Sequence, residues 1–181
     1  MTQSFNINTV SPQLVNLVGV VSLAIADQIR QSTESAAGQS ASATAALVLI
    51  HRYRGITVDV LGRYLQLSQS GAVRLVDRLT QQRWVQRNRG QDKRFVTLAL
   101  TEVGKGVAIA ILQERQQQIA QVLTVLTPQD QQQLSQLLTK ITSQQPSIGE
   151  QAEFMCRLCD MSACPLEACQ DQWTKLNDLS C

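Results

Sequence analysis

The sequence predicts a mainly α-helical fold that contains one small β-hairpin. Small aliphatic residues and glutamine dominate the 181 residues, whereas aromatic residues make up only 4%, and this composition favours helix over sheet. Most apolar residues recur at a spacing of three or four, which is the period of an amphipathic helix. The stretch at 84–101 is the exception, because it includes alternating residues and a polar tip typical of a hairpin.

The first predicted helix covers residues 12–31, with Pro12 in its first turn. A connector of small residues, 32–46, leads to a second helix that ends near Gly55. The most apolar part of the first helix, 14–26, is interrupted by polar residues and is too short to cross a bilayer. No basic segment followed by an apolar core stands at the start, so we expect a cytoplasmic protein without a membrane anchor.

Two shorter helices precede the hairpin, and each has a hydroxyl side chain at its start. Thr57 is the expected N-cap of the helix over 57–67. Ser68 has the same place in the helix over 68–82. The inward stripe of this second helix is predicted to consist of Val73, Val76 and Leu79.

Two further helices are predicted after the hairpin. Thr101 is the expected cap of a long helix over 102–126. Thr127 and Pro128 start the last one, in which an acidic residue occupies the third helical position. The apolar face of that last helix comprises Leu134, Leu137, Leu138 and Ile141.

This order of elements is that of a winged helix-turn-helix lobe with further helices before and after it. In such a lobe the second helix of the turn enters the DNA major groove, and the wing contacts the backbone or the minor groove. We divide the chain into an N-terminal dimerisation helix with its connector, the winged lobe, the C-terminal dimerisation helices, and a linker with a cysteine-rich tail. The expected boundaries are 1–40, 41–101, 102–145 and 146–181.

The positive charge of the chain is concentrated in its middle, although the net charge is only +2. Residues 45–105 contain eleven Lys or Arg and four Asp or Glu, whereas the rest of the chain contains five and ten. A basic block of this kind is typical of a surface that binds a polyanion such as DNA. A solvated basic face without a partner has the same composition.

The segment TVDVLGRYLQLSQSGAVRLVDRLTQQRWVQRNRGQDKRFVTLALTEVGKG resembles the central pattern of the MarR family of bacterial transcription regulators. Its most specific parts are LSQSGAVRLVDRL, the wing triplet Asp92-Lys93-Arg94, and LTEVGK at the start of the long helix. LTPQDQQQLSQLLTKI also resembles the last helix of that family, so the resemblance covers about residues 10–145. It implies a bacterial cytoplasmic homodimer, joined by its terminal helices, that binds a pseudo-palindromic site in double-stranded DNA.

The resemblance also implies two groups of DNA-binding residues, one at the start of the recognition helix and one in the wing. Ser70, Arg74 and Arg78 agree with this, because their spacing puts them opposite the inward stripe. Arg78 could instead be structural beside Asp77, and the cations of the first wing strand could be ordinary exposed residues. Asp92 is the acid that braces the wing. The DNA-binding set is Ser68, Gln69, Ser70, Arg74, Arg78, Arg87, Arg89, Lys93 and Arg94.

One position departs from the family pattern. The family usually has glycine just before the first wing strand, where this chain has Arg83 followed by Trp84. Glycine permits a positive φ at little cost. Arginine therefore predicts either a different turn or a mildly strained one.

Four cysteines lie within fourteen residues of the tail, and none precedes them. Structural disulfides are rare in a reducing cytoplasm, so we predict a metal site with the ligands Cys156, Cys159, Cys164 and Cys169. Only the first pair has zinc-knuckle spacing, and one compact loop with a Cys-Pro step suits an iron–sulfur cluster. Zn²⁺ is the alternative metal. Thiols without metal, or a dithiol that pairs on oxidation, also fit the pattern; Cys181 is left out of the ligand set.

Three functions fit these features. The first is a DNA-binding regulator that senses redox or iron status through an iron–sulfur cluster held by the four cysteines. The second is a repressor released by a small phenolic ligand between the dimer helices and the DNA-binding lobe, with structural zinc in the tail. The third is an iron–sulfur electron-transfer protein that uses the helices as a scaffold. Because the sequence contains no recognisable catalytic constellation, we do not expect an enzyme.

Overall fold

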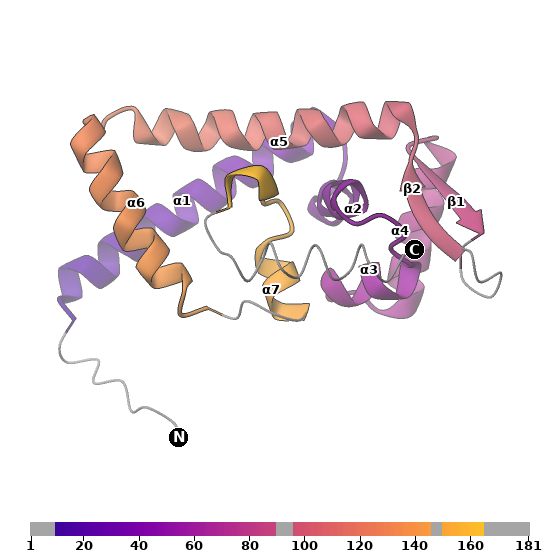
Figure 1. Cartoon of the computed structure of the whole chain (residues 1–181), viewed down its shortest axis with the longest axis horizontal. Helices are drawn as coiled ribbons and strands as arrows, with labels where there is room; N and C mark the ends of the chain where they lie inside the picture. The colour runs from indigo at the N-terminus through magenta and orange to yellow at the C-terminus, as the bar shows by residue number, and fades with distance from the viewer. Residues whose placement is uncertain (1–9, 90–95, 146–149, 165–181) are drawn as a thin grey trace, which may run out of the picture.

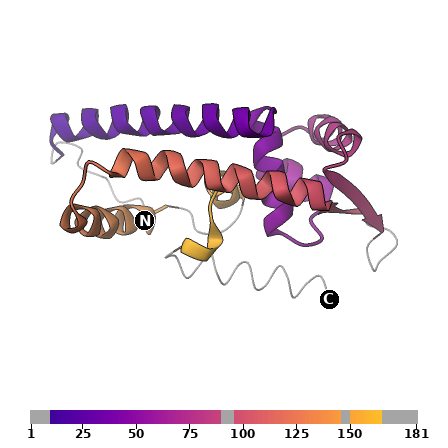
Figure 2. The same ribbon diagram turned by 90° about the horizontal axis from the view of Figure 1, so that it is seen from above.

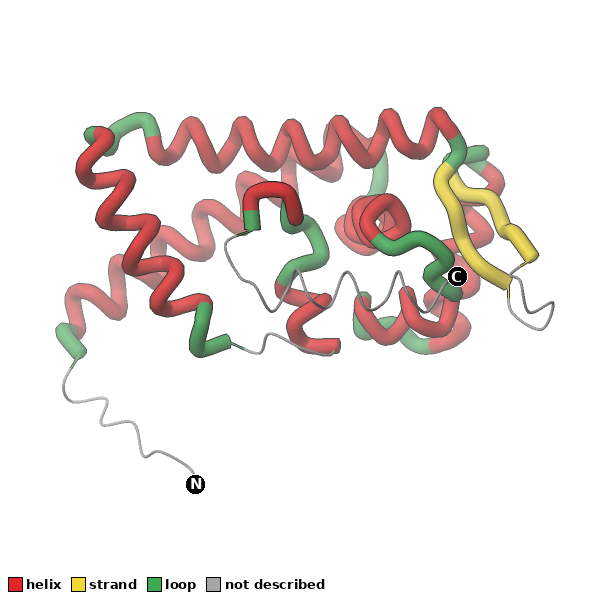
Figure 3. Tube along the Cα trace, viewed as in Figure 1, coloured by secondary structure: helices red, strands yellow, loops and turns green. Residues whose placement is uncertain are grey.

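A computed structural model of the chain describes residues 10–89, 96–145 and 150–164. The elements before and within the hairpin are α1 (Pro12–Ala37), α2 (Ala41–Arg52), α3 (Val58–Tyr64), α4 (Gln69–Gln81), β1 (Val85–Arg89) and β2 (Val96–Leu100). They are followed by α5 (Glu102–Leu123), α6 (Pro128–Thr142), α7 (Glu150–Met155) and the short 3-10 helix η2 (Met161–Ala163). Figure 3 shows the predicted fold class, mainly helical with one antiparallel hairpin.

Two long helices, α1 and α5, run side by side and form the spine of the molecule (Figures 1 and 2). The winged lobe of α2, α3, α4 and the hairpin lies at one end of this pair, and α6 lies at the other. The centre of the lobe is α2, in which every residue from 43 to 50 is buried. The largest fully buried apolar side chains join α2 to its neighbours and are Leu47, Leu49, Leu61, Leu79, Leu98 and Ile111.

The four predicted N-caps are present. Thr57, Ser68 and Thr101 each accept a hydrogen bond from the backbone N–H three residues later, at 3.3, 3.2 and 3.1 Å. The Thr127 side chain accepts a hydrogen bond from the Asp130 N–H at 3.2 Å, and the Asp130 side chain accepts one from the Thr127 N–H, which completes a capping box. The predicted starts of these helices are therefore confirmed.

The end of the first helix differs from the prediction. α1 continues through Ala37, and only three residues, 38–40, separate it from α2. Alanine is the strongest helix former, so the small residues interpreted as a connector extend both helices. Gly38 then ends α1 with a φ of 60°, and the Gln39 N–H donates to the Glu34 carbonyl at 3.1 Å, which closes a Schellman turn.

The first half of α1 is apolar and exposed. The prediction that this helix is too short to cross a membrane rested on residues 14–26 alone. The whole helix is long and apolar enough to do so by length and composition. Core helices of soluble proteins have the same property. Apolar residues of α6 are exposed as well, among them Leu137, Leu138 and Ile141. The exposed apolar residues of α1 are Leu14, Val15, Leu17, Val18, Val20, Val21 and Leu23.

The buried stripe of α4 is shifted from the predicted one. It consists of Ala72, Leu75, Val76 and Leu79, whereas Val73 is 39% exposed. The reason is the close approach of α3, because a Cβ on Gly62 would lie 2.9 Å from the Ala72 Cβ. This contact turns Ala72 inward and leaves Val73 on the outer face.

Candidate functional site

The exposed face of α4 brings the predicted recognition residues together. Gln69, Ser70, Arg74 and Arg78 are all exposed, as is the capping residue Ser68. Arg74 Nε donates to the Ser70 carbonyl at 3.2 Å, and its guanidinium lies 3.4 Å from the Ser70 hydroxyl. These contacts hold the Arg74 side chain along the helix, one turn from its N-terminus.

The wing is tied to this helix by an ion pair. The Arg87 guanidinium of β1 donates to Asp77 of α4 at 2.8 Å, with both side chains partly exposed, so the pair stabilises the lobe by at most about 1 kcal/mol. Asp77 thus pairs with Arg87 rather than with Arg78. The side chain of Arg89 and all of Asp92, Lys93 and Arg94 lie outside the described residues.

Arg83 keeps the backbone conformation that glycine would adopt. Its φ is 59°, and its side chain is exposed at the junction between α4 and the wing. The Arg83 N–H donates to the Thr80 carbonyl at 2.9 Å, and the Arg83 carbonyl accepts from the Thr101 hydroxyl at 2.6 Å. The prediction of a strained turn is confirmed, and the turn places one more cation beside the recognition helix.

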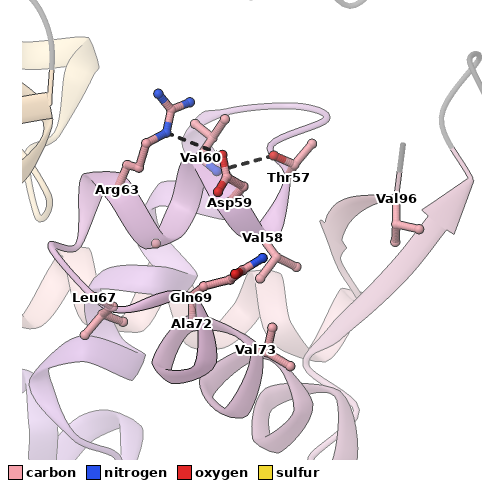
Figure 4. A pocket seen from close by; sticks show the side chains of 11 residues that line it. Thr57, Val58, Asp59, Val60, Arg63, Leu67, Gln69, Ala72, Val73 and Val96 are labelled. Atoms are coloured by element: carbon pink, nitrogen blue, oxygen red, sulfur yellow. Dashed lines mark hydrogen bonds and ion pairs between the residues drawn. The ribbon is translucent and has the colours of Figure 1, made fainter. Parts of the chain in front are cut away.

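A groove of about 810 Å³ lies between α3, α4 and β2 (Figure 4). Val58 from α3, Gln69 and Val73 from α4, and Val96 from β2 lie around it. Val73, predicted to belong to the core, therefore belongs to the outer surface beside the recognition residues. No sequence signal revealed this, because an apolar residue three positions before Val76 also fits the inward period.

The cysteine loop lies against the helices. Cys156, Cys159 and Cys164 are half-buried and form no disulfide with one another, and all three line a cavity of about 580 Å³ together with Arg115 of α5 and residues of α6. Cys169 lies outside the described residues. In the ranges that the structure describes, no three His, Cys, Asp or Glu side chains are placed so that they could hold a metal ion.

The loop nevertheless suits an anionic sulfur. The Cys156 thiol donates a hydrogen bond to Cys159, and this contact, with the nearby Arg115 and Arg52 guanidinium groups, lowers the pKa of Cys159 to about 6. Burial and the Asp160 carboxylate act in the opposite direction but do not prevail. The thiolate is the form of cysteine that binds metals, so the surroundings of Cys159 suit the ligand role predicted for it.

A buried carboxylate fixes the tail to the winged lobe, a contact that the sequence did not reveal. Glu153 of α7 is only 1% exposed, and its partner Arg52, the last residue of α2, is 9% exposed. The Glu153 carboxylate lies 3.5 Å from the Arg52 guanidinium and accepts a hydrogen bond from the Tyr53 hydroxyl. Burial and this hydrogen bond raise the pKa of Tyr53. We call this contact of Glu153, Arg52 and Tyr53 the clasp.

The winged lobe has a recognisable family pattern. Residues 38–94, which include α2, α3, α4 and β1, match the model of the MarR family. Over these residues the winged lobe is similar to that family. The match ends well before the cysteine tail.

Known proteins extend this MarR likeness beyond the lobe. The uncharacterized HTH-type transcriptional regulator YwhA of Bacillus subtilis is 29% identical over 85 residues, 46% of this chain and 61% of YwhA. Apo MarR from E. coli is 25% identical over 73% of this chain and 98% of its own, with a TM-score of 0.58. A mutant of MepR from S. aureus, bound to an oligodeoxyribonucleotide, has the same fold at 19% identity, 72% and 96% coverage and a TM-score of 0.57. Together these comparisons show that the chain is similar to MarR-family proteins in the sequence of its winged lobe and in its fold.

Proposed function

We propose that this protein is a homodimeric, sequence-specific DNA-binding regulator of transcription in the bacterial cytoplasm. The observation that carries the proposal is the exposed polar and basic face of α4 beside the wing, in a lobe of the MarR family. In this arrangement α4 enters the major groove, where Arg74 suits the O6 and N7 acceptors of guanine. The groove-lining Val73 suits a thymine methyl group next to it.

The apolar faces of α1 and α6 support a homodimer. A monomer leaves large apolar residues of both helices exposed, with Leu23 as high as 71%. A second copy of the same chain would cover them by a two-fold interface, and two lobes related by that axis would read a pseudo-palindrome. Half-sites would then lie about one helical turn apart.

We further propose that the tail senses redox or iron status through an iron–sulfur cluster held by Cys156, Cys159, Cys164 and Cys169, with Zn²⁺ as the alternative. The support is the donor chemistry, since three of these cysteines share one cavity with Arg115. The cluster would supply a change of charge on oxidation or loss. Arg115 and Arg52 would offset the negative charge of the thiolates.

The position of the tail favours it over a small phenolic ligand as the regulatory element. Arg157 and Leu158 line a cavity with residues of α1, α2 and α5, and Leu158 packs against the core. The tail thus forms part of the wall of the cavity beside the long helices, near the place where such a ligand is expected to bind.

The DNA proposal is tested with an operator selected from a random-sequence duplex library. The full-length protein should bind the selected duplex with a strong salt dependence. Arg74→Ala should lower the specific affinity about 5- to 150-fold, the equivalent of about 1–3 kcal/mol for a lost base contact. Arg30→Ala removes the same charge from α1 and serves as the control. Equal affinity for the wild type and Arg74→Ala would exclude the assigned role of α4.

The metal proposal is tested by purifying the protein without oxygen and measuring iron, sulfide and zinc. A coloured protein with iron and sulfide supports the cluster. A colourless protein with one zinc per chain replaces it by the zinc alternative. If neither metal is retained, the tail is not a metal centre.

A further inference from the structure

We propose that the clasp couples the cysteine loop to the recognition helix, with Glu153 as the positioning residue. The inference rests on the proposed function, because it assigns the route by which the metal state of the tail would change DNA binding. Its basis is a buried charged contact between a segment outside the family match and the lobe that the match defines.

The clasp is expected to be either fully formed or fully broken, without stable intermediate positions of the carboxylate. Its three members are buried, and Glu153 follows Tyr53 by 100 residues in the chain. A buried carboxylate is tolerated only when it is paired and hydrogen-bonded. The carboxylate is therefore either docked on Arg52 and Tyr53 or withdrawn into water together with α7.

On the tail side, the clasp is rigidly joined to the predicted metal ligands. The Cys156 N–H donates to the Ala152 carbonyl at 2.9 Å and so continues α7 by one more helical hydrogen bond. The Cys159 N–H then donates to the Cys156 carbonyl at 2.8 Å. Arg52 also lines a small cavity with Cys159, so the residue that pairs with the carboxylate borders the loop as well. A loop that rearranges on metal loss would therefore pull on α7.

On the lobe side, the clasp leads to the recognition helix through α3. α7 packs against α3, and the Tyr53 ring lies against the Tyr64 ring at the end of α3, with ring centroids 5.8 Å apart. α3 in turn packs against α4, where a Cβ on Gly62 would lie 2.9 Å from the Ala72 Cβ. Release of α7 removes a support of α3 and so shifts α4 relative to the wing.

The test uses the full-length protein in three forms: loaded with ferrous iron and sulfide, loaded with Zn²⁺, and metal-free. The affinity of each form for the selected operator is measured without oxygen, and amide exchange of α7 is followed in parallel. Two variants break the clasp from opposite sides, Glu153→Gln in the tail and Tyr53→Phe in the lobe. Gln151→Ala changes an exposed residue of α7 and is the control.

Metal loading should change the affinity of the wild type by about 5- to 150-fold, the usual range of coupling between two sites. The same ratio should be retained in Gln151→Ala. It should fall to less than about twofold in both clasp variants, while their metal content stays that of the wild type because no ligand has changed. Amide protection of α7 should fall in both clasp variants.

The possible failures can be told apart. If the wild type binds DNA equally in all three forms, the proposed sensing function is wrong and the coupling falls with it. If the wild-type ratio is large and both clasp variants retain it while α7 loses protection, the sensing stands and the clasp is not its route. If α7 stays protected in both variants, the clasp does not hold the tail, and the inference is again overturned.

Discussion

At the scale of single residues, Arg83 shows that a folded lobe can hold a non-glycine residue in an unfavourable backbone conformation. Arginine occupies a left-handed conformation that glycine favours, with its φ at 59°. A side chain in this region costs about 1–2 kcal/mol. The hydrogen bonds of the turn hold the conformation in place, and the exposed guanidinium stands where the recognition helix meets the wing.

Arg83→Gly should therefore stabilise the protein while weakening DNA binding. The relief of strain exceeds the extra chain entropy of glycine, about 0.5–1 kcal/mol, so the free energy of unfolding should rise by about 0.5–1 kcal/mol. The salt dependence of DNA binding should fall by about one unit of slope if Arg83 contacts a phosphate. Denaturant unfolding and salt titrations measure the two effects.

Arg83→Ala is the matched control, because it removes the charge and keeps the strain. It should show the weaker salt dependence without the gain in stability. Equal unfolding free energies for the glycine and alanine variants would contradict the interpretation of this turn.

Cys159 gives a second prediction at this scale, for the metal-free protein. Since the folded pKa of about 6 lies below the ordinary thiol value, its rate of alkylation by iodoacetamide should stay nearly level from pH 8 to pH 7 and fall below about pH 6. The associated stability is complete above the unfolded pKa and is lost as the pH falls through 6. Mass spectrometry of the modified peptide follows the reaction.

Cys156→Ser tests the cause of this shift. It replaces the thiol donor beside Cys159, so the midpoint of the Cys159 alkylation profile should change. Denatured protein supplies the ordinary profile. A wild-type midpoint at the denatured value would show that the loop does not favour the thiolate.

At the scale of elements, features decided by neighbouring residues could be predicted from the sequence. Features decided by contacts between distant residues could not. The caps at Thr57, Ser68, Thr101 and Thr127 were predictable because each helix start is decided within a few residues of sequence. The end of α1 differs from the prediction because a run of small residues that fits a connector also fits a helix, and alanine favours the helix. Nothing in the segment EQAEFM marks Glu153 as a buried residue, since its partners come from α2 and its vicinity.

In the candidate site, too, the spacing of residues along a helix could be predicted and contacts between elements could not. Periodicity alone placed Ser70, Arg74 and Arg78 on one exposed face, and the structure has them there. The pairing of Arg87 with Asp77 depends on how the hairpin folds back on α4, which no spacing rule supplies. The roles of the DNA-binding residues and of the four cysteines remain predictions, and Asp92, Lys93, Arg94 and Cys169 lie outside the described residues.

The junction of α5 with the wing should be sensitive to one methyl group. A Cβ on Gly104 would lie 2.0 Å from the Trp84 carbonyl oxygen, so either the helix or the hairpin must move. Gly104→Ala should destabilise the protein by about 1–3 kcal/mol. Denaturant unfolding at fixed protomer concentration measures this.

Gly106→Ala, two residues along the same helix, is the control. A Cβ there meets no atom within 4 Å, so alanine should stabilise by about 0.5–1 kcal/mol through helix propensity alone. Changes of the same sign at both glycines would contradict the assigned close approach.

At the scale of the whole molecule, the proposed dimer depends on the exposed apolar half of α1. Leu17→Glu would place a charge within the proposed dimer interface, so the protein should become monomeric and lose most of its operator affinity, because each half-site alone binds weakly. Light scattering during size-exclusion chromatography gives the molar mass. Asn16→Glu adds the same charge at a neighbouring polar position and is the comparison.

The same variants test whether α1 inserts into membranes instead of forming a dimer interface. If α1 inserted into membranes, the wild type would float with phospholipid vesicles and the mass of the soluble species would not depend on Leu17. A dimeric Leu17→Glu protein would likewise exclude α1 as the dimer interface.

The long sequence separation within the clasp also affects how each molecule is made. Arg52 and Tyr53 are synthesised 100 residues before Glu153 is added, which at about 5–20 residues per second is a delay of about 5–20 seconds. The winged lobe has this time to fold without the carboxylate that later docks on it. In each newly made chain the winged lobe therefore exists before α7, and the tail docks on a lobe that has already taken shape.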